Sequence, residues 1–489
     1  MNNVRKNVWK LVIAGMPLLL AACAIGPDYK KAPDVDIGTS YKAAAAYDAQ
    51  FPQKPTVAQY QAAANQAWVQ ANVDDLSKGD WWLRFEDAQL NQLMNELNTS
   101  NLEIEQALAR YDAAVASLRS SQASLFPTLA GSASSTRSGG DEQQVGNAYK
   151  ATASLSWELD LWGKIRRQVQ ASKAQAQASA ADWANVRLSM QAQLAKAYFG
   201  LRMIDEQIKL LNQIVASDEQ AVAMNQRRYN QGVAARADVV SAMTQLESAR
   251  AQAINIQSTR QQYESAIAVL LGKAPSQFVL VAQPFVAHIP TIPTVLPSVL
   301  LTRRADIYSA ERAVAAANEQ IGIAQAAWLP SLSLSASSGW QASSWSDWFA
   351  APLNVWSLGP QLALSLFDGG ARSAALASSK AQYREQVAAY RQTVLTALKE
   401  VEDNMTLVST LAQQYEVQQR ALSAARESLT ITRNQYQAGM VNYLSVIQVE
   451  NTTYNTEIST LQLINQRLSA AIDLVVALGG GWSAPIEGK

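Results

Sequence analysis

The chain has very little of the chemistry on which most enzymes and metal proteins depend. Its 489 residues include one cysteine, Cys23, and one histidine, His288. His288 stands in a proline-rich stretch with no second histidine beside it, which argues against a histidine-dependent triad or a zinc site. One cysteine also excludes a disulfide within the chain. We therefore expect no catalytic residue, no metal and no bound cofactor.

Charge is scarce as well. Charged residues make up 16% of the chain, below the usual level of about 25%. The 40 basic residues balance the 40 acidic ones, which argues against a nucleic-acid partner. Acidic pairs occur by chance, but none stands in a recognisable catalytic motif. An enzyme is therefore the weakest of the function classes that we considered.

The apolar run near the N-terminus is too short to span a bilayer. A positively charged start precedes Leu11–Leu20, which has the length of a signal-peptide core. The run ends in L-A-A-C, which resembles a bacterial lipobox and predicts a signal peptide over residues 1–22 and a covalent lipid on Cys23. Ala24, rather than aspartate, follows and predicts sorting to the outer membrane. The alternative is a plain signal peptide with an incidental cysteine.

The chain contains one long internal repeat. The motif Y-x-x-G occurs at Tyr229–Gly232 and again at Tyr436–Gly439, 207 residues later. Each copy is followed by a helical stretch that ends in Leu-Gly, at 271–272 and 478–479, with the same offset. Such a duplication predicts a pseudo-symmetric architecture.

Each repeat predicts a long helix and a shorter returning one. Residues 164–229 and 372–436 contain no proline, and a helix of this length spans about 100 Å. Glycine turns near 232 and 439 precede return helices over 237–271 and 443–478. Helices this long indicate a coiled coil. The second return helix has a heptad row, in which Asn451 either sets the register or faces a lumen: Leu444, Ile447, Asn451, Tyr454, Ile458, Leu461, Asn465, Leu468, Ile472 and Val475.

Each repeat also predicts a β-hairpin, over 128–161 and 331–367. Leucines alternate there with serines, as on a strand with one apolar face. The strands have the length of transmembrane β-strands. Four strands leave two open edges, so several chains must contribute to a barrel. The loop tryptophans fit an interfacial girdle, although a small soluble sheet is an alternative: Trp340, Trp345, Trp348 and Trp356.

These segments divide the chain into an ordered set of parts. Residues 23–75 are expected to form an extended N-terminal tether after the signal peptide. The first repeat covers 76–283, with one helix predicted from Asp87 to Ser124 ahead of its hairpin. A proline-rich linker covers 284–300, the second repeat 301–482, and a C-terminal tail 483–489.

Several motifs together resemble the TolC-like outer-membrane efflux family, and specifically its NodT/OprM-like lipoprotein branch. The resemblance covers nearly the whole mature chain. It rests on motifs at the start, at the strand-to-helix junctions and at the end of the repeats: W-W at 81–82, E-L-D-L-W-G-K at 158–164, R-R-A-D-I at 303–307, L-F-D-G-G-A-R at 366–372 and A-L-G-G-G-W at 477–482. Ala305 replaces a proline that the family has.

The resemblance implies a fold and a function. The expected fold is mainly α, with an outer-membrane β-barrel to which each of three chains gives four strands, continuous with a long periplasmic helical barrel. The expected function is passive exit of drugs or other small molecules from the periplasm. The implied partners are two further copies of the chain, outer-membrane lipid, a periplasmic adaptor and an inner-membrane pump of the resistance-nodulation-division type.

The resemblance also implies site residues. Tyr436 matches a gate tyrosine at the periplasmic tip, and three positions after it often carry charge in relatives but are neutral here: Ser445, Gln448 and Asn451. Three copies of Gln448 could still close the bore through hydrogen bonds. The expected tip turns and adaptor contacts are Tyr229, Gly232, Arg236, Asp238 and Gly439. Arg236 and Asp238 are equally well explained as a solvated pair.

Two alternatives stay open at this point. One is a channel for secreting proteins or peptides. The other is a lipid-anchored coiled-coil scaffold without a pore. Between the two repeats, the second is expected to be the gate and the first the fixed wall.

Overall fold

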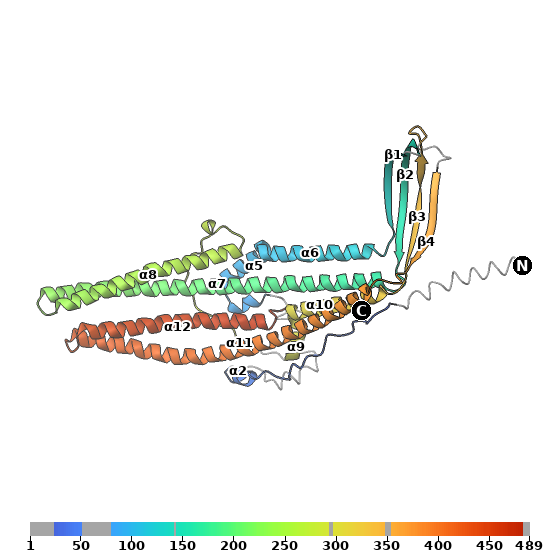
Figure 1. The fold of residues 1–489 in the computed structure, drawn as a ribbon. Coiled ribbons are helices and arrows are strands. Elements are labelled where there is room, and N and C mark those ends of the chain that lie inside the picture. The colour runs from blue at the N-terminus through green and yellow to red at the C-terminus, as the bar shows by residue number, and fades with distance from the viewer. Residues whose placement is uncertain (1–23, 51–79, 141–142, 293–296, 348–353, 483–489) are drawn as a thin grey trace. The chain divides into compact units, whose positions relative to one another are not determined.

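The computed structural model describes residues 24–50, 80–140, 143–292, 297–347 and 354–482 (Figure 1). It is mainly helical with one four-stranded sheet. The chain divides into two compact units, one from residues 1–34, 109–181 and 309–392 and the other from residues 35–108, 182–308 and 393–489. No helix in the described ranges has an apolar stretch long enough to cross a bilayer.

The first unit holds the sheet. Its strands lie in the order β1 (Thr128–Gly140), β2 (Gln143–Leu159), β3 (Ser331–Ala342) and β4 (Asn354–Ala363), all antiparallel (Figure 1). The four predicted strands are confirmed. The pairing of β2 with β3 joins the hairpins of the two repeats into one sheet, and β1 and β4 are its edges.

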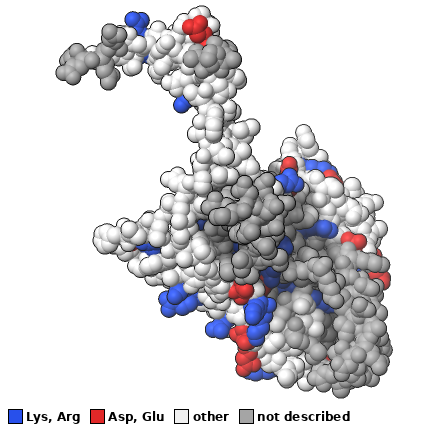
Figure 2. All heavy atoms as spheres, turned by 90° about the vertical axis from the view of Figure 1, so that its right-hand side faces the viewer, with Lys and Arg blue, Asp and Glu red and all other residues white. Residues whose placement is uncertain are grey.

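The two faces of this sheet differ in chemistry. The register places Leu129 opposite Leu155, Leu155 opposite Ala336, and Ala336 opposite Leu358. Residues paired in this way share a face, so one apolar row crosses all four strands. Serines and threonines occupy the other face, where the Ser337 and Ser357 hydroxyls lie 2.8 Å apart. The upper, strand-rich part in Figure 2 carries very little charge on the visible side.

An aspartate caps the N-terminus of the long helix in both repeats. Asp160 accepts hydrogen bonds from the backbone N–H groups of Ile165, at 3.0 Å, and Arg166, at 2.9 Å. Asp368 accepts in the same way from Arg372, at 3.2 Å. In each case the arginine side chain also donates to the aspartate. A carboxylate at the helix N-terminus satisfies backbone donors that have no partner within the helix, which explains the two similar junction motifs.

The predicted N-terminal tether is not a free extended chain over its described part. Arg167 donates hydrogen bonds to the backbone oxygens of residues 25–27 and to the Asp28 carboxylate, and it forms an ion pair with Glu319 at 2.7 Å. Ile25 donates its own N–H to the Trp162 carbonyl at 3.1 Å. A buried guanidinium needs many acceptors, and this N-terminal backbone provides them.

The later part of the same segment also packs, in the second unit. It includes the short helix α2 (Ala44–Gln50), whose Tyr47 is 1% exposed and donates its hydroxyl to the Ile292 carbonyl at 2.8 Å. The N–H of Ala43 donates to Glu402 at 2.8 Å. The composition of residues 23–75 indicated a tether. The contacts that pack this segment, made by Arg167 and Tyr47, join residues far apart in the sequence, and composition cannot reveal them.

The second unit contains most of two helical hairpins. One is α7 (Lys164–Asn230) with α8 (Arg236–Leu270), and the other is α11 (Ala371–Gln437) with α12 (Tyr443–Ala477) (Figure 1). The bounds agree with the predicted helices to within two residues. They are well fixed by the sequence because long runs of good helix formers without proline end at glycine turns.

The prediction of one opening helix over Asp87–Ser124 is wrong at Asn101. The structure has α5 (Ala88–Ser100) and α6 (Leu102–Ala123). The Asn101 side chain accepts from the N–H groups of Glu103, at 3.0 Å, and Ile104, at 2.9 Å. Asparagine is a strong N-cap residue, so it starts a new helix there. The second repeat has the same break, between α9 (Pro297–Arg303) and α10 (Ala305–Ala326).

These breaks explain the Leu-Gly that closes each repeat. The Asn101 amide donates to the Leu270 carbonyl at 2.7 Å, and the Arg304 guanidinium donates to the Ala477 carbonyl at 3.1 Å. Gly272 and Gly479 have φ values of +68° and +95°. A Cβ on Gly479 would lie 2.3 Å from the Arg303 carbonyl oxygen. Each return helix therefore ends against the break of its own opening helices.

The core of the second unit is built around the tryptophan pair near the start of the first repeat. Trp81 and Trp82, in the short helix η1 (Trp81–Phe85), are each 1% exposed and meet edge to face at 6.1 Å. Trp81 donates its ring N–H to Gln191 at 3.2 Å. The first return helix is followed by another short helix, η2 (Pro275–Gln277). The conspicuous W-W motif is thus a packing motif.

The heptad predicted for α12 is displaced by one residue in its first half. The buried row there is Tyr443, Val446, Glu450 and Thr453, whereas Leu444 of the predicted row is 54% exposed. From Leu468 onward the predicted positions are buried. Apolarity alone selected the wrong row because a glutamate is rarely buried without a partner, and its partner, Arg433, lies on α11 across the tip turn.

Candidate functional site

The two hairpin tips have the same backbone. At the first, the N–H groups of Gly232 and Val233 donate to the carbonyls of Tyr229 and Arg228 at 2.9 and 3.0 Å. At the second, Gly439 and Met440 donate to Tyr436 and Gln435 at 3.0 and 2.8 Å. This is the Schellman pattern, which needs a residue with positive φ. Gly232 and Gly439 provide it, with φ of +76° and +75°.

The two tip tyrosines have different surroundings. Tyr229 is 40% exposed, and the Arg236 guanidinium lies 5.7 Å from its ring centre. Tyr436 is 5% exposed and donates its hydroxyl to the Asn225 side chain at 2.5 Å. Only the second tyrosine therefore ties its own hairpin to the other one.

Further contacts hold Tyr436 in place. The Arg228 guanidinium lies 4.7 Å from its ring centre and donates to its carbonyl at 3.4 Å. The Tyr443 ring lies 5.3 Å away at a tilt. Burial, opposed by the charge of Arg228, raises the pKa of Tyr436, so the hydroxyl remains a hydrogen-bond donor at neutral pH.

The three polar positions predicted at the gate are not brought together. Ser445 donates its N–H and its hydroxyl to Asn442, the N-cap residue of α12, at 3.0 and 2.9 Å. Gln448 is exposed. Asn451 and Gln245 of α8 exchange amide hydrogen bonds at 2.9 and 3.3 Å. Asn451 thus joins the two hairpins within one chain.

Arg236 and Asp238 lie at the start of α8 and have separate surroundings. Arg236 is exposed and contacts Tyr229, as described above. Asp238 lies in the first turn of α8, where a negative charge favours the helix dipole. Both positions have a local structural role that does not depend on any partner.

A buried polar cluster near the tip was missed by sequence reasoning. Arg433 of α11 donates to Glu450 of α12 at 2.7 and 3.0 Å and to Ser217 of α7 at 3.1 Å. Asp218 of α7 is 1% exposed and Glu450 is 3% exposed. The available signal was Glu450, an acidic residue within the row of 3- and 4-residue steps formed by Tyr443, Val446, Glu450 and Thr453.

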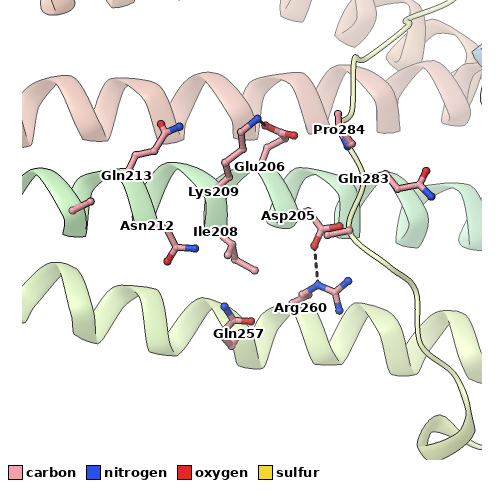
Figure 3. A pocket seen from close by; sticks show the side chains of 12 residues that line it. Asp205, Glu206, Ile208, Lys209, Asn212, Gln213, Gln257, Arg260, Gln283 and Pro284 are labelled. Atoms are coloured by element: carbon pink, nitrogen blue, oxygen red, sulfur yellow. Dashed lines mark hydrogen bonds and ion pairs between the residues drawn. The ribbon is translucent and has the colours of Figure 1, made fainter.

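A groove of about 650 Å³ lies beside α7 and α8 (Figure 3). It is lined by one face of α7 between Asp205 and Ala216, by Gln257 and Arg260, and by residues 282–284. Its charged groups are already paired: Asp205 with Arg260 at 2.7 Å and Lys209 with Glu206 at 3.6 Å. Since Arg260 also donates to the Leu280 carbonyl at 2.5 Å, these groups fasten the segment after α8 to the hairpin.

The predicted aromatic girdle lies at one end of the sheet. Trp340 pairs with Asn354 next to the β3–β4 connection, and Trp356 follows two residues later. Trp345, in that connection, meets the Tyr149 ring edge to face at 5.6 Å. Trp356 and Trp345 are 77% and 66% exposed. Trp348 and the predicted lipid-bearing Cys23 lie outside the described residues.

The chain is similar in sequence to outer-membrane proteins of efflux systems. It is 29% identical over 489 residues to outer membrane protein OprJ of Pseudomonas aeruginosa, and the alignment covers 98% of this chain and 97% of OprJ. It is 27% identical over 438 residues to the probable outer membrane lipoprotein SilC of Salmonella typhimurium, which covers 88% of this chain and 94% of SilC.

Its fold is also that of a solved outer-membrane channel. The open state of the MtrE outer membrane channel of Neisseria gonorrhoeae matches with a TM-score of 0.80 and 25% identity, over 94% of this chain and 99% of MtrE. The family model described as outer membrane efflux protein matches residues 93–273 and 296–480, which overlap the two predicted repeats. The chain therefore belongs to the outer membrane efflux protein family, and it is an outer-membrane protein with an efflux function.

Proposed function

We propose that three copies of this chain form the exit channel of a tripartite efflux pump. The observation that carries the proposal is the sheet, which exposes an apolar face and leaves β1 and β4 as edges. Open edges are not tolerated in the hydrocarbon region of a membrane. Three sheets joined edge to edge would remove every open edge and place the apolar rows toward lipid.

The proposed channel works with two protein partners and with lipid. The tip turns, with Tyr229, Gly232, Arg236, Asp238 and Gly439, are the proposed contact with a periplasmic adaptor. The adaptor would connect the channel to an inner-membrane pump of the resistance-nodulation-division type. A covalent lipid on Cys23 would anchor the chain in the outer membrane, as the name of the relative SilC also suggests for that protein.

We further propose that the gate is formed at the tip of the second hairpin. Tyr436 and Asn451 bond to Asn225 and Gln245 of the first hairpin, so opening would break these contacts. Gln448 is exposed on α12, where three copies could meet across the bore. Adaptor binding would shift the population toward an open form.

The proposal is tested by reconstituting the full-length processed protein in planar bilayers and measuring conductance and oligomer mass. We expect a trimer with stepwise channel conductance, and Gln448→Ala should raise the resting conductance. Gln462→Ala, an exposed glutamine of the same helix, is the matched control. A stable monomer without conductance would instead favour the coiled-coil scaffold.

A cellular experiment distinguishes the cargo. Deleting the gene should raise the accumulation of a fluorescent dye, and complementation should restore export. If deletion blocks export of a peptide while dye accumulation stays unchanged, the chain serves secretion and the small-molecule assignment is wrong.

A further inference from the structure

The buried polar cluster near the tip, here called the Asp218 cluster, consists of Ser217, Asp218, Arg433, Tyr443, Glu450 and Tyr454. It lies among α7, α11 and α12. Both carboxylate oxygens of Asp218, Oε2 of Glu450 and the Tyr443 hydroxyl are buried and have no hydrogen-bond partner among the described residues. Buried polar groups without partners are rare in native proteins and need an explanation.

The charges of the cluster do not balance when both acids are ionised. Arg433 donates two hydrogen bonds to Oε1 of Glu450 and so neutralises that carboxylate. An ionised Asp218 would be an additional negative charge in the cluster. Burying an uncompensated carboxylate is costly, and such a group usually takes up a proton instead. A neutral Asp218 has an O–H donor, the kind of partner that the unpartnered Oε2 of Glu450 lacks.

The groups that face Asp218 come from each element packed around it. α12 contributes Glu450, Tyr443 and Tyr454, and α11 contributes Arg433. α8 contributes the apolar Ala249 to the neighbouring contact, while its Arg250 is bound to Glu219 at 2.7 Å on the exposed side of α7. Burial first and the charge of Glu450 second raise the pKa of Asp218 to about 6, against the lowering effect of Arg433.

The internal repeat shows that the architecture does not require this cluster. The positions 207 residues away from Asp218, Arg433 and Glu450 hold Ala425, Gln226 and Met243. None of these can titrate. The cluster is therefore a property of one contact between the hairpins, at the end of the molecule where the gate is proposed.

We propose that Asp218 is a proton-dependent latch, which in its neutral form holds α7 against α11 and α12 and in its ionised form loosens this contact. The consequence for conduction rests on the proposed channel function.

The direction of the effect follows from linkage. A buried carboxyl group with a raised pKa binds its proton more tightly in the packed state than in a released, solvated state. Protons therefore favour the packed cluster, and this preference is lost as the pH rises through about 6. The resting channel should be closed more firmly in acid and open more readily near neutral pH.

The main test measures single-channel open probability of the reconstituted full-length protein between about pH 5 and pH 7.5. We expect an increase of about fivefold or more across this range, with a midpoint near 6. Asp218→Asn, which resembles the neutral acid in shape, should keep the low open probability at every pH. Glu219→Gln removes an adjacent exposed charge and should leave the wild-type pH dependence intact.

A second readout does not depend on conduction. Infrared difference spectra should show the carbonyl stretch of a neutral carboxyl group that disappears near pH 6 in the wild type and is missing in Asp218→Asn. If no variant conducts at any pH, the proposed function fails and the infrared titration still decides the latch. The latch is overturned if Asp218→Asn keeps the pH dependence, if the wild type has none, or if the midpoint follows the identity of the salt cation at fixed pH.

Discussion

The two repeats close the end of their return helices with the same geometry but different chemistry. In the first, the uncharged side-chain amide of Asn101 donates one hydrogen bond to the Leu270 carbonyl. In the second, Arg304 donates to the Ala477 carbonyl and also to Asp306 and Glu400, both at 2.7 Å. The backbone architecture of a duplication can therefore persist while a single hydrogen bond is replaced by a network of charged groups.

The two hairpin tips also differ, and again the second repeat makes the larger number of polar contacts. Tyr229 of the first repeat is 40% exposed, whereas Tyr436 of the second is buried and donates a hydrogen bond to Asn225. Three charged members of the Asp218 cluster, Asp218, Arg433 and Glu450, likewise have uncharged residues at the repeat-related positions. The contacts between hairpins thus depend on side chains whose identity or surroundings differ between the two copies. The assignment of the second hairpin as the gate stays a prediction.

The largest expected loss of stability comes from replacing a glycine that packs against another backbone segment, compared with a glycine that only provides positive φ at a turn. Gly479→Ala should destabilise the protein by about 3 kcal/mol or more, because the new Cβ meets the Arg303 carbonyl in addition to the cost of positive φ. Gly439→Ala has only that second cost, about 1–2 kcal/mol, since nothing lies within 4 Å of its Cβ position. Thermal unfolding in detergent measures both, and equal effects would contradict the close packing.

The next prediction compares the stability lost when Arg304 or Asn101, the side chains that bind the ends of the two return helices, is replaced. Arg304→Gln should cost about 3 kcal/mol, because it leaves Asp306 and Glu400 without their partner. Asn101→Ala should cost about 1–2 kcal/mol through the loss of a helix cap and one further bond. The same unfolding assay ranks them, and a larger loss for Asn101→Ala would reverse our assignment of the charged closure as the stronger one.

A smaller effect concerns the tip tyrosines. Tyr436→Phe should destabilise the closed hairpin contact by about 1–2 kcal/mol, because the Asn225 oxygen loses its donor. We expect a higher resting conductance in bilayers. Tyr229→Phe is the matched control and should change conductance little, since Tyr229 is 40% exposed. Similar conductance changes in both variants would argue against a special role for Tyr436.

The smallest effect is the coupling between Gln245 and Asn451. A double-mutant cycle with alanine at each position should give a coupling energy of about 0.5–1 kcal/mol, because a neutral amide pair contributes little net stability. Guanidine unfolding of the four variants measures it. A coupling energy near zero would mean that these amides do not hold the hairpins together.

The elements of the fold were largely predictable because their signals are local. Helix bounds follow from proline-free runs ending at Gly232 and Gly439, and the strands follow from strict alternation. The break at Asn101 was missed although a capping residue marks it, because the apolar spacing continues through it. The packed N-terminal segment could not be predicted, since Arg167 and its acceptors are about 140 residues apart in sequence.

The candidate site was predictable only in part. The sequence pointed to Tyr436 and Asn451 through the repeat and the family resemblance, but not to their partners Asn225 and Gln245. Displacement of the buried row on α12 by one residue also hid Glu450, because a buried charge is recognised only together with the Arg433 that neutralises it.

The sequence by itself determined the duplication, the lengths of the helices, the amphipathic strands and the family. These properties depend on residue type and spacing along one segment. The tertiary structure alone decided which polar groups are buried together, such as Asp218 with Glu450 and Arg433. Burial and charge compensation depend on groups from three helices, and no single segment of the chain contains that information.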